Sequence, residues 1–542
     1  MKNEPCRHLV LILGDQLDEA SSAFDGFDAE KDVVLMVEAF EESTHVWSHK
    51  VRTTLFLSAM RHFAADLKQR GWRVDYRSLD VEGDKTLGAG LLAALQKYQP
   101  QRVIGVEPGD LRVRQQLEDA IKSIAAESRK NWATGIKHLK NGHEGELGSL
   151  IPEWREDKHF LCGINQFRKW AGTSSSLRME FFYRQMRKQY RVLVEGKNSD
   201  EPVGGQWNFD ADNRKGFGKA GPQNVPQLVQ YPQDQITRDV IKLVSQHFAD
   251  HPGNLDNFNW PVTREQALLA LKSFIDERLP QFGPHEDAMW TNLDFGWHSL
   301  LSSSLNLKLL NPLEVIHAAE AAYKEHDLDL ASVEGFIRQI LGWREFMRGV
   351  YFLDMPELKT ANHYGHTNAL PKWYWTGDTK MNCMRQCINQ TLANGYSHHI
   401  QRLMVTGMFG VTAQISPQAI CDWYLAVYVD AVEWVELPNT GGMALFANGG
   451  RFTSKPYVAS GAYIKRMSNY CAGCSYEPET RVGSKACPMT TLYWNFLDQH
   501  EADFAANPRT ALMVKNLQRM TPELRQQVGQ RAGEMLADLD GL

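Results

Sequence analysis

The hydrophobic pattern divides the chain into an amino-terminal part with strands and a longer part without them. Four short apolar or β-branched runs occur within the first 110 residues, at 8–14, 32–38, 72–79 and 102–108. Helical segments lie between them, the clearest at 49–71, which ends on a glycine suited to a helix C-terminus. Strands that alternate with helices predict a parallel sheet with helices on both faces. We therefore expect a Rossmann-like α/β domain over residues 1–135.

A connecting region is expected next, over residues 136–230. Glycines and polar residues dominate 204–227, and a loop of that length is uncommon unless it is functional or disordered. Trp207 and Phe209 within this loop indicate order. Just before it, residues 178–191 interleave basic side chains with aromatic ones. That segment predicts either a phosphate-contacting surface or the solvated face of a helix.

From residue 231 onward, apolar residues recur at steps of three and four, which is the period of α-helices. We find no convincing strand pattern in 231–542. The segment 416–437 is expected to be one such helix, because Ser416 suits an N-cap and Pro417 suits the first helical position. The sequence thus predicts an all-helical domain of about 300 residues, large enough for its own core.

Three cysteines near the carboxyl end have the spacing of metal ligands. Cys471 and Cys474 flank a glycine-containing turn, and Cys487 follows after twelve further residues. Upstream, Cys383 or Cys387 could supply a fourth thiolate. Four such thiolates hold structural zinc or an iron–sulfur cluster, and spacing alone does not choose between these. Three free thiols are the plainer interpretation, which the compact spacing disfavours.

Three segments of the helical domain carry candidate binding chemistry. Serines cluster over 299–303 before a helix, where hydroxyls and backbone amides would suit a diphosphate. His398, His399 and Arg402 lie together at the start of another helix. Asp430 lies in an otherwise apolar segment, where a carboxylate needs a partner. Arg402 is the natural partner for it.

In the α/β domain, ligands are expected beyond the carboxyl ends of the strands. The sequence places the turn 14–16, Glu38 and the segment 107–110 there. No G-x-G-x-x-G follows the first strand, so a dinucleotide is not favoured at this edge. These polar groups predict a small-molecule pocket or, equally, ordinary turn and capping contacts.

Composition narrows the choice of partners and location. The 542 residues are 43% hydrophobic and 23% charged, as in ordinary globular proteins, with a net charge of −6. An acidic average argues against a nucleic-acid partner unless a local basic surface exists. The apolar run at the amino terminus is too short for a signal peptide or a membrane span. We expect a cytoplasmic monomer with no obligate protein partner.

The chain resembles the photolyase/cryptochrome flavoproteins over nearly its full length. More narrowly, it is similar to their bacterial iron–sulfur branch, the prokaryotic (6-4) photolyases. The most specific parts are GGQWNFDADNR, the segment 299–312, SHHIQRLM, and the C-x2-C-x12-C-P set with Cys383. The resemblance implies an α/β antenna domain, a long linker, and an all-helical FAD-binding domain over 231–542 with a four-cysteine iron–sulfur site.

The resemblance also implies roles for individual residues. Those implied to contact FAD are Ser299, Leu301, Ser302 and Ser303 around its phosphates, Arg402 and Asp430 beneath the isoalloxazine, and Glu436 beside flavin N5, where other photolyases place an Asn. Those implied to relay electrons to the flavin are Trp375, Trp423 and Tyr424. The implied ligands of a [4Fe–4S] cluster are Cys383, Cys471, Cys474 and Cys487. The implied antenna chromophore is 6,7-dimethyl-8-ribityllumazine, to which we assign Glu38.

The activity that the resemblance implies is light-driven repair of (6-4) photoproducts in UV-damaged DNA. Photoexcited reduced FAD would donate an electron, and His398 or His399 would act as the general acid. Eukaryotic relatives carry a further histidine where this chain has Leu403, which argues against a two-histidine mechanism of their kind. The alternatives are a sensory cryptochrome without repair activity, a photolyase for cyclobutane dimers, and a light-independent flavin–iron–sulfur oxidoreductase.

Overall fold

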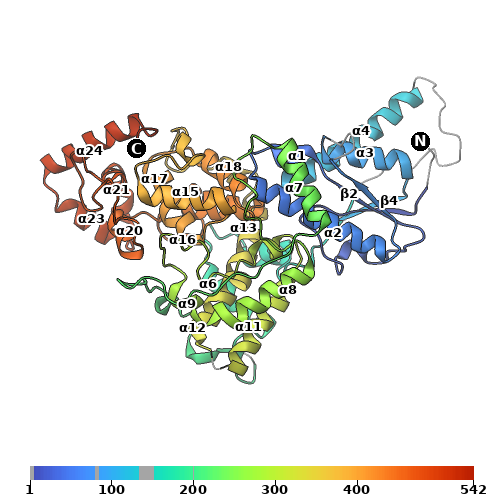
Figure 1. The fold of residues 1–542 in the computed structure, drawn as a ribbon, viewed down its shortest axis with the longest axis horizontal. Coiled ribbons are helices and arrows are strands. Elements are labelled where there is room, and N and C mark those ends of the chain that lie inside the picture. The colour runs from blue at the N-terminus through green and yellow to red at the C-terminus, as the bar shows by residue number, and fades with distance from the viewer. Residues whose placement is uncertain (1–4, 80–84, 134–151, 199, 327) are drawn as a thin grey trace.

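The structure, a computed structural model, describes residues 5–79, 85–133, 152–198, 200–326 and 328–542 of the chain. The domain boundary predicted at residues 135 and 136 lies outside these ranges. In Figure 1, an α/β domain forms one end of the molecule and the helices nearest the carboxyl terminus form the other. A further group of helices, within residues 264–337, forms a third corner between these ends.

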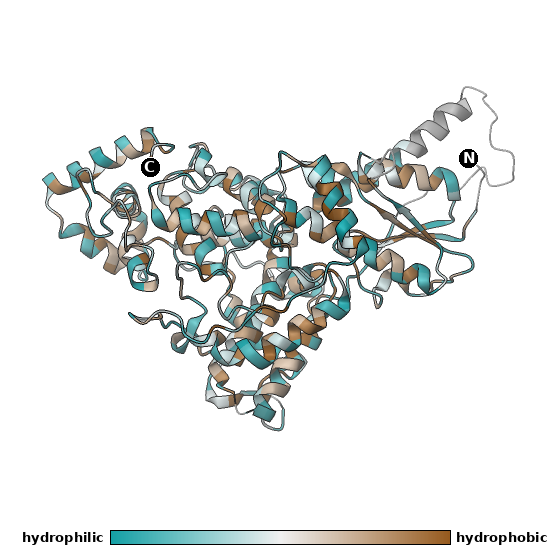
Figure 2. Ribbon diagram, viewed as in Figure 1, coloured by the Kyte–Doolittle hydropathy of each residue, from teal (hydrophilic) through white to brown (hydrophobic). Residues whose placement is uncertain are grey.

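Five parallel strands form the sheet of the α/β domain, in the order β3-β2-β1-β4-β5. Four of them form within the predicted apolar runs, namely β1 (His8–Leu11), β2 (Val33–Val37), β3 (Val74–Arg77) and β4 (Arg102–Val106). Helix α2 (Lys50–Gln69) packs on one face, and α3 (Leu87–Tyr98) with α4 (Leu111–Ala133) covers the other. Because both faces are covered, the central strands are apolar along their length (Figure 2). The predicted parallel α/β sheet is confirmed.

The fifth strand, β5 (Glu153–Arg155), comes from the region that the sequence predicts as linker. It pairs with β4 through Ile104 to Val106, so the sheet extends further along the chain than expected. The prediction of a purely connecting region is wrong at this point, because a strand of three residues is too short to show an alternating pattern. Two helices follow it, α5 (Ile164–Ala171) and α6 (Met179–Tyr190).

Residues 204–233, which we call the strap, cross the helical domain with little regular structure beyond the short turn η4 (Asp210–Asp212). Polar contacts hold the strap in place. The amide of Phe209 donates to Glu334, Arg338 donates to Asp210, and the buried Asn213 side chain donates to the carbonyl of Ala331. The long loop is therefore ordered, as its aromatic residues indicate.

The rest of the chain is helical, and among the described residues no strand follows Pro202. The main helices are α7 (Gln235–His247), α8 (Arg264–Ser273), α9 (Leu279–His285), α10 (Ser302–Asn306), α11 (Pro312–His326), α12 (Leu330–Ile337), α13 (Glu345–Asp354), α15 (Asn382–Asn394), α16 (His399–Gln401), α17 (Met408–Thr412), α18 (Pro417–Val427), α19 (Glu433–Glu436), α20 (Gly461–Met467), α21 (Pro488–Gln499) and α24 (Pro522–Ala537). No helix in the described part of the chain is both long and apolar enough to span a membrane.

The segment 416–437 is not a single helix. Helix α18 begins with Pro417 in its first turn, as predicted, but it ends at Val427, where Tyr428 takes an extended conformation. Helix α19 begins only at Glu433. The prediction of one continuous helix is wrong because the apolar spacing continues through the break. The break places Asp430 in a turn, where its side chain and its carbonyl both meet other elements.

The two domains are joined tightly at the start of α2. The amide of His49 donates to the carbonyl of Ala426 on α18, at 2.8 Å, and its ring Nε2 lies 2.9 Å from the carbonyl oxygen of Leu392 on α15. One turn later, the guanidinium of Arg52 donates to the carbonyl of Ala431. The first turn of α2 is thus fixed against the helical domain.

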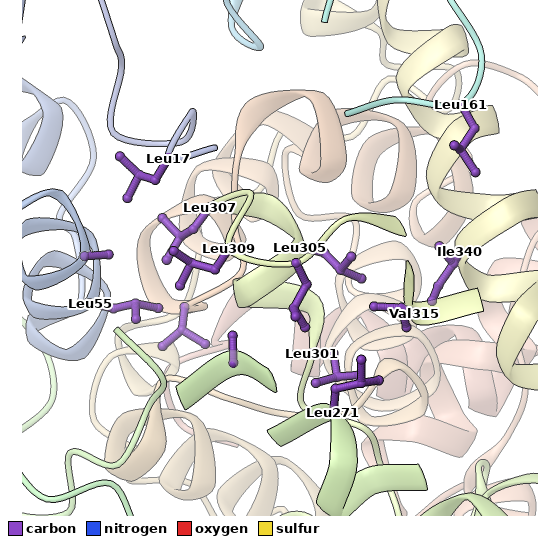
Figure 3. Close-up of a cluster of buried hydrophobic side chains, with 14 of the residues drawn as sticks. Leu17, Leu55, Leu161, Leu271, Leu301, Leu305, Leu307, Leu309, Val315 and Ile340 are labelled. Atoms are coloured by element: carbon purple, nitrogen blue, oxygen red, sulfur yellow. The ribbon is translucent and has the colours of Figure 1, made fainter. Parts of the chain in front are cut away.

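The apolar core under α10 and α11 gathers leucines from distant segments. Figure 3 shows Leu301 and Leu305 beside Leu271 and Val315, with Leu307 and Leu309 facing Leu17 and Leu55 of the α/β domain. Leu301 is 1% exposed. Its side chain therefore belongs to this core, and only its backbone could contact a cofactor.

Helix α6 carries the basic and aromatic segment of the sequence, and its central arginine is buried. Arg187 is inaccessible to solvent and donates to the carbonyls of Val192, Leu193 and Trp207. Its guanidinium also lies 5.1 Å from the ring centroid of Trp207. Arg187 therefore neither faces solvent nor is available to contact a phosphate, which were the two predictions for this segment. It instead fixes the start of the strap.

We expect Arg187→Ala to lower the free energy of unfolding by about 3 kcal/mol, because buried carbonyls would lose their donor. Arg184→Ala is the matched control, since it removes a part-exposed ion pair with Glu180, worth under about 1 kcal/mol, together with cation–π contacts to Phe181 and Trp207. Urea denaturation followed by tryptophan fluorescence measures both losses. Equal effects of the two substitutions would contradict the structural role of Arg187.

Candidate active site

The site is built around an ion pair between Arg402 and Asp430, as the sequence predicts. The guanidinium donates to both carboxylate oxygens, at 3.0 and 3.2 Å, and to the carbonyl of Ser397. It also lies 3.8 Å from the ring centroid of Tyr428, a cation–π contact. Arg402 begins the π-helical turn η8 (Arg402–Gly407), which follows directly on α16. The pair joins that turn to the break after α18.

The serine segment meets this ion pair from a third direction. The hydroxyl of Ser302 donates to Asp430, at 2.7 Å, and Asn306 donates to the carbonyl of Asp430, at 2.8 Å. Both come from the short helix α10. The hydroxyl of Ser303 is buried and has no hydrogen-bond partner in the described structure. An unpaired buried hydroxyl is costly, so this position suits a bound polar group.

A cavity of about 490 Å³ opens beside the serine segment. Ser299 lines it together with the aromatic rings of Trp260 and Phe295, Asn394 at the end of α15, and the cationic side chain of Arg278. Its volume falls in the range of about 300–1,000 Å³ that is typical of small-molecule and cofactor sites. Aromatic walls with one arginine and a serine suit a ligand that has both rings and an anionic part.

Glu436 lies at the end of α19 and is buried. The hydroxyl of Thr440 donates to its carboxylate at 2.9 Å. Burial raises the pKa of Glu436 to about 7, although the Arg402 guanidinium acts in the opposite direction. The carboxyl group can therefore gain or lose a proton near neutral pH, close to the central ion pair.

Three histidines stand together at the start of α16. The rings of His298 and His398 are stacked, with centroids 4.5 Å apart and an interplanar angle of 16°. His399 meets both rings edge-on, at 5.8 and 6.0 Å, and its Nε2 lies 3.3 Å from the Asp287 carboxylate. The His398 side chain is buried, and its Nδ1 has no hydrogen-bond partner in the described residues.

Their surroundings give the paired histidines opposite charge preferences. Burial, followed by the charges of His298, His399 and Arg402, lowers the pKa of His398 well below its ordinary value. Partial burial also opposes protonation of His399, but the hydrogen bond and the charge of Asp287, aided by Glu286, outweigh it and raise its pKa. His399 is also about half exposed. It is thus the histidine that can carry and deliver a proton near pH 7.

The strap brings basic side chains to the same region. The amide of Lys215 donates to the carbonyl of Pro284, three residues before Asp287. Phe217 packs on Trp297, which directly precedes the stacked histidine His298. Arg214, Lys215 and Lys219 of the strap are exposed, as is Arg466 at the end of α20. Exposed cations are therefore present on the strap and at the end of α20, although Arg214 is ion-paired with Asp210.

The three predicted relay residues lie in one aromatic row that leads away from the ion pair. Tyr424 and Trp423 are neighbours on α18, with ring centroids 5.4 Å apart, and Trp423 lies 6.4 Å from Trp375. The hydroxyl of Tyr424 donates to the carbonyl of Arg402, at 2.6 Å. The row therefore begins in direct contact with the centre of the site.

Four cysteines line one apolar cavity near the carboxyl end, as the sequence suggests. Cys383 lies in the first turn of α15, Cys471 and Cys474 flank a turn in which Gly473 has φ +74°, and Cys487 caps α21. Burial and the neighbouring thiolates, that of Cys487 first, raise the pKa of Cys383 well above its ordinary value. Cys387 lies one turn further along α15 and does not line the cavity. The geometry favours Cys383 as the fourth member.

Among the residues that the structure describes, no group of three or more His, Cys, Asp or Glu side chains has the arrangement of a single-ion site. All four thiols nevertheless line the same small cavity. Four thiolates are a donor set that suits either an iron–sulfur cluster or a structural zinc ion.

Glu38, assigned above to the antenna chromophore, is fully engaged by the protein. Arg61 donates to both of its carboxylate oxygens, and Tyr76 and the amide of Leu79 donate to it as well. The side chain is buried. Gln16 in the nearby turn donates to the carbonyl of Val106, which ties β1 to β4. The lumazine assignment stays a prediction, and binding through Glu38 would require one of these partners to move.

Sequence reasoning did not find His298 and Asp287. His298 directly precedes the serine segment, and this position is the sequence feature that could have identified it as a site residue. Asp287 follows α9 in a loop with no recognisable pattern, and only the fold brings it to His399.

The chain is similar to known proteins over nearly its whole length. Residues 10–136 and 136–260 match the family described as deoxyribodipyrimidine photo-lyase-related protein. The chain is 42% identical over 534 residues to a (6-4) photolyase of Agrobacterium fabrum, covering 98% of this chain and 99% of that protein.

Solved structures show the same fold. A bacterial class III photolyase from Agrobacterium tumefaciens matches with a TM-score of 0.54 at 13% identity, covering 99% of both chains. A cryptochrome from Synechocystis sp. PCC6803 matches with a TM-score of 0.52 at 13% identity, over 86% of this chain and 89% of that one. With the whole-length relative, these similarities show that the chain belongs to the photolyase/cryptochrome family, in its (6-4) photolyase branch.

Proposed function

We propose that this protein is a flavin-dependent photolyase that repairs (6-4) photoproducts in UV-damaged DNA under light. One observation carries the proposal. His398 and His399 stand one turn from the Arg402–Asp430 ion pair, in a chain 42% identical to a (6-4) photolyase over its whole length. A cyclobutane-dimer photolyase needs no general acid, whereas the pairing of His399 with Asp287 keeps a proton ready.

The described residues fit FAD. Arg278 and Ser299 would bind its anionic part, and the Arg402–Asp430 pair would lie under its redox-active ring. Ser303 offers a buried hydroxyl that lacks a partner. Glu436, with its pKa raised to about 7 by burial, would exchange a proton with the flavin edge. When bound and reduced, FAD supplies the light-driven electron; the protein's own part is to hold it, exclude water and move protons.

His399 is proposed as the general acid of the repair reaction. Transfer of the oxygen substituent back from one damaged base to the other requires a proton donor within hydrogen-bond reach. His399 is exposed enough to meet the lesion, and Asp287 stabilises its imidazolium. His398, buried and neutral, would hold the His399 backbone in place by stacking on His298.

DNA would approach across the strap and α20. The exposed cations there, Arg214, Lys215, Lys219 and Arg466, would contact phosphates. A damaged base pair stacks poorly, so flipping it toward His399 costs only a few kcal/mol. These positive side chains would attract DNA locally, although the whole chain carries a net charge of −6.

The four cysteines are proposed to hold a [4Fe–4S] cluster. Such a centre would join α15 to the segment 471–487 and to the start of α21, elements that lie far apart in the sequence. A structural role is the simplest account of that connection. The lumazine antenna, the monomeric state and the cytoplasmic location stay predictions.

The proposed activity can be tested with short DNA duplexes that carry one (6-4) photoproduct or one cyclobutane dimer. We expect blue light to restore the (6-4) substrate only, with no reaction in the dark. Repair of the dimer alone would favour the cyclobutane-dimer alternative. Bound flavin with neither substrate repaired would favour a sensory cryptochrome.

The acid assignment predicts a specific pH dependence. Repair needs protonated His399, so its rate should fall as pH rises through the raised pKa of His399. Asp287→Asn removes the main cause of that raised pKa and should move the alkaline fall to lower pH. His399→Ala should abolish repair at every pH while FAD stays bound. An unshifted profile in Asp287→Asn would exclude Asp287 from this role.

The cluster assignment predicts that Cys474→Ala loses iron and acid-labile sulfide, together with much of the soluble yield. Cys387→Ala is the matched control, because that buried thiol lies on the same helix as Cys383 but outside the cavity. It should keep the full iron content. Metal analysis of the purified wild-type protein decides between the alternatives, since zinc in place of iron would contradict a cluster.

A further inference from the structure

Trp47 is an exposed tryptophan of the α/β domain that lies against the helical domain. Its side chain is 43% exposed, which is unusual for so large an apolar group. It lies between α1 (Phe40–Thr44) and α2, and its ring centroid is 4.9 Å from that of Trp375. More than 300 residues of sequence separate the two rings, so the contact depends on domain docking.

The Trp47–Trp375 contact extends an aromatic row that reaches the centre of the site. From Trp375 the row continues to Trp423 at 6.4 Å, then to Tyr424 at 5.4 Å. Tyr424 lies 5.3 Å from Tyr428, on which the Arg402 guanidinium rests. Each neighbouring pair is within the distance range of ordinary aromatic contacts. The row therefore joins the ion pair to solvent without a gap.

A second branch leaves Trp423 but ends inside the protein. Tyr374 lies 5.1 Å from Trp423, and Trp373 lies 4.8 Å from Tyr374. Both rings are buried, with exposures of 0% and 2%. The Trp373 indole donates to the carbonyl of Leu539, and the Tyr374 hydroxyl to that of Thr406. A solute cannot reach this branch, whereas it can reach Trp47.

The position of Trp47 is fixed by the polar contacts that begin α2. Two residues later, His49 bonds to α18 and α15 through its amide and its ring. Arg52 bonds to the carbonyl of Ala431, in the break that carries Asp430. The contacts of His49 fix the Trp47 end of the row, and those of Arg52 fix the turn that carries Asp430 at its other end.

We propose that Trp47 is the surface terminus of the electron relay, where a soluble one-electron donor such as a thiol delivers the electrons that reduce the flavin. This rests on the proposed function, in which light drives one electron at a time from the row to bound flavin. Each such transfer leaves one aromatic side chain oxidised. That side chain is reduced again by the next ring along the row, first Trp423, then Trp375 and finally Trp47. Oxidised Trp47 releases its indole proton to water. A thiolate then donates one electron, the indole takes up a proton, and the resulting thiyl radical pairs to a disulfide.

The test compares Trp47→Phe and Trp47→Tyr with Trp72→Phe. Phenylalanine keeps an aromatic ring beside the part-exposed Trp375 but is not oxidised under these conditions, whereas tyrosine can be oxidised. Trp72 is a part-exposed tryptophan of the same domain that packs on Phe24 and Phe27, so its substitution controls for loss of one indole. The measurement is the rate of flavin photoreduction under blue light with dithiothreitol, together with tryptophan-radical lifetime after a laser flash.

We expect Trp47→Phe to slow photoreduction several-fold and to shorten the radical lifetime, because the electron returns before the thiol arrives. Trp47→Tyr and Trp72→Phe should stay near wild type. Near-UV circular dichroism of flavin-free protein should change in Trp47→Phe, since the Trp47–Trp375 contact is lost. Unchanged photoreduction in Trp47→Phe, or equal slowing in Trp72→Phe, would overturn the proposal.

A repair assay with chemically reduced enzyme separates this proposal from the proposed function. Enzyme reduced with dithionite before illumination needs no relay, so Trp47→Phe should repair the (6-4) substrate as fast as wild type. Absence of repair in the wild-type protein would remove the proposed function and leave the photoreduction result standing. Loss of repair in prereduced Trp47→Phe alone would show that Trp47 acts in another way, and would overturn its assignment as a relay terminus.

Discussion

The buried ion pair between Arg402 and Asp430 is the interaction on which the site depends. A guanidinium and a carboxylate taken out of water are costly unless each finds partners, and here every neighbouring element supplies one. Ser302 and Asn306 meet Asp430 from α10, and Tyr428 lies under Arg402. The pair therefore connects three segments that the sequence separates widely. It also gives the helical domain a charged centre where a redox cofactor can be held.

Electrostatics around this centre separate the roles of chemically similar groups. His398 and His399 are adjacent in sequence, yet one packs against a third histidine and loses its proton, while the other faces Asp287 and keeps it. Glu436, in contrast to the ion-paired Asp430, has among the described residues only a threonine hydroxyl as side-chain hydrogen-bond donor, and burial raises its pKa to about 7. Environment rather than residue type thus sets which groups move protons.

Contacts between the α/β domain and the helical domain are a second set of interactions that the site depends on. The first turn of α2 holds the α/β sheet to α15 and α18 through backbone carbonyls, so small displacements there would reach the Asp430 turn through Arg52. The aromatic row crosses the same boundary at Trp47 and Trp375. In the proposed relay, the α/β domain would therefore supply the surface end of the aromatic row, in addition to being the candidate place for an antenna. The cysteine cavity lies at the other end of the helical domain and joins α15 to α21 there.

Spacing left the fourth cysteine open between Cys383 and Cys387, but the sequence by itself determined the parallel α/β domain, the helical character of the rest, the partnership of Arg402 with Asp430 and the grouping of Cys471, Cys474 and Cys487. These follow from periodicity, spacing and the need of a buried charge for a partner, all of which are local or pairwise. Only the tertiary structure decided that β5 joins the sheet, that the helix through 416–437 breaks at Tyr428, and that Arg187 and Glu38 are internally satisfied. It also brought Asp287 to His399 and Trp47 to Trp375. Such contacts join residues over 100 positions apart, and no local pattern records them because packing of whole elements sets the distances.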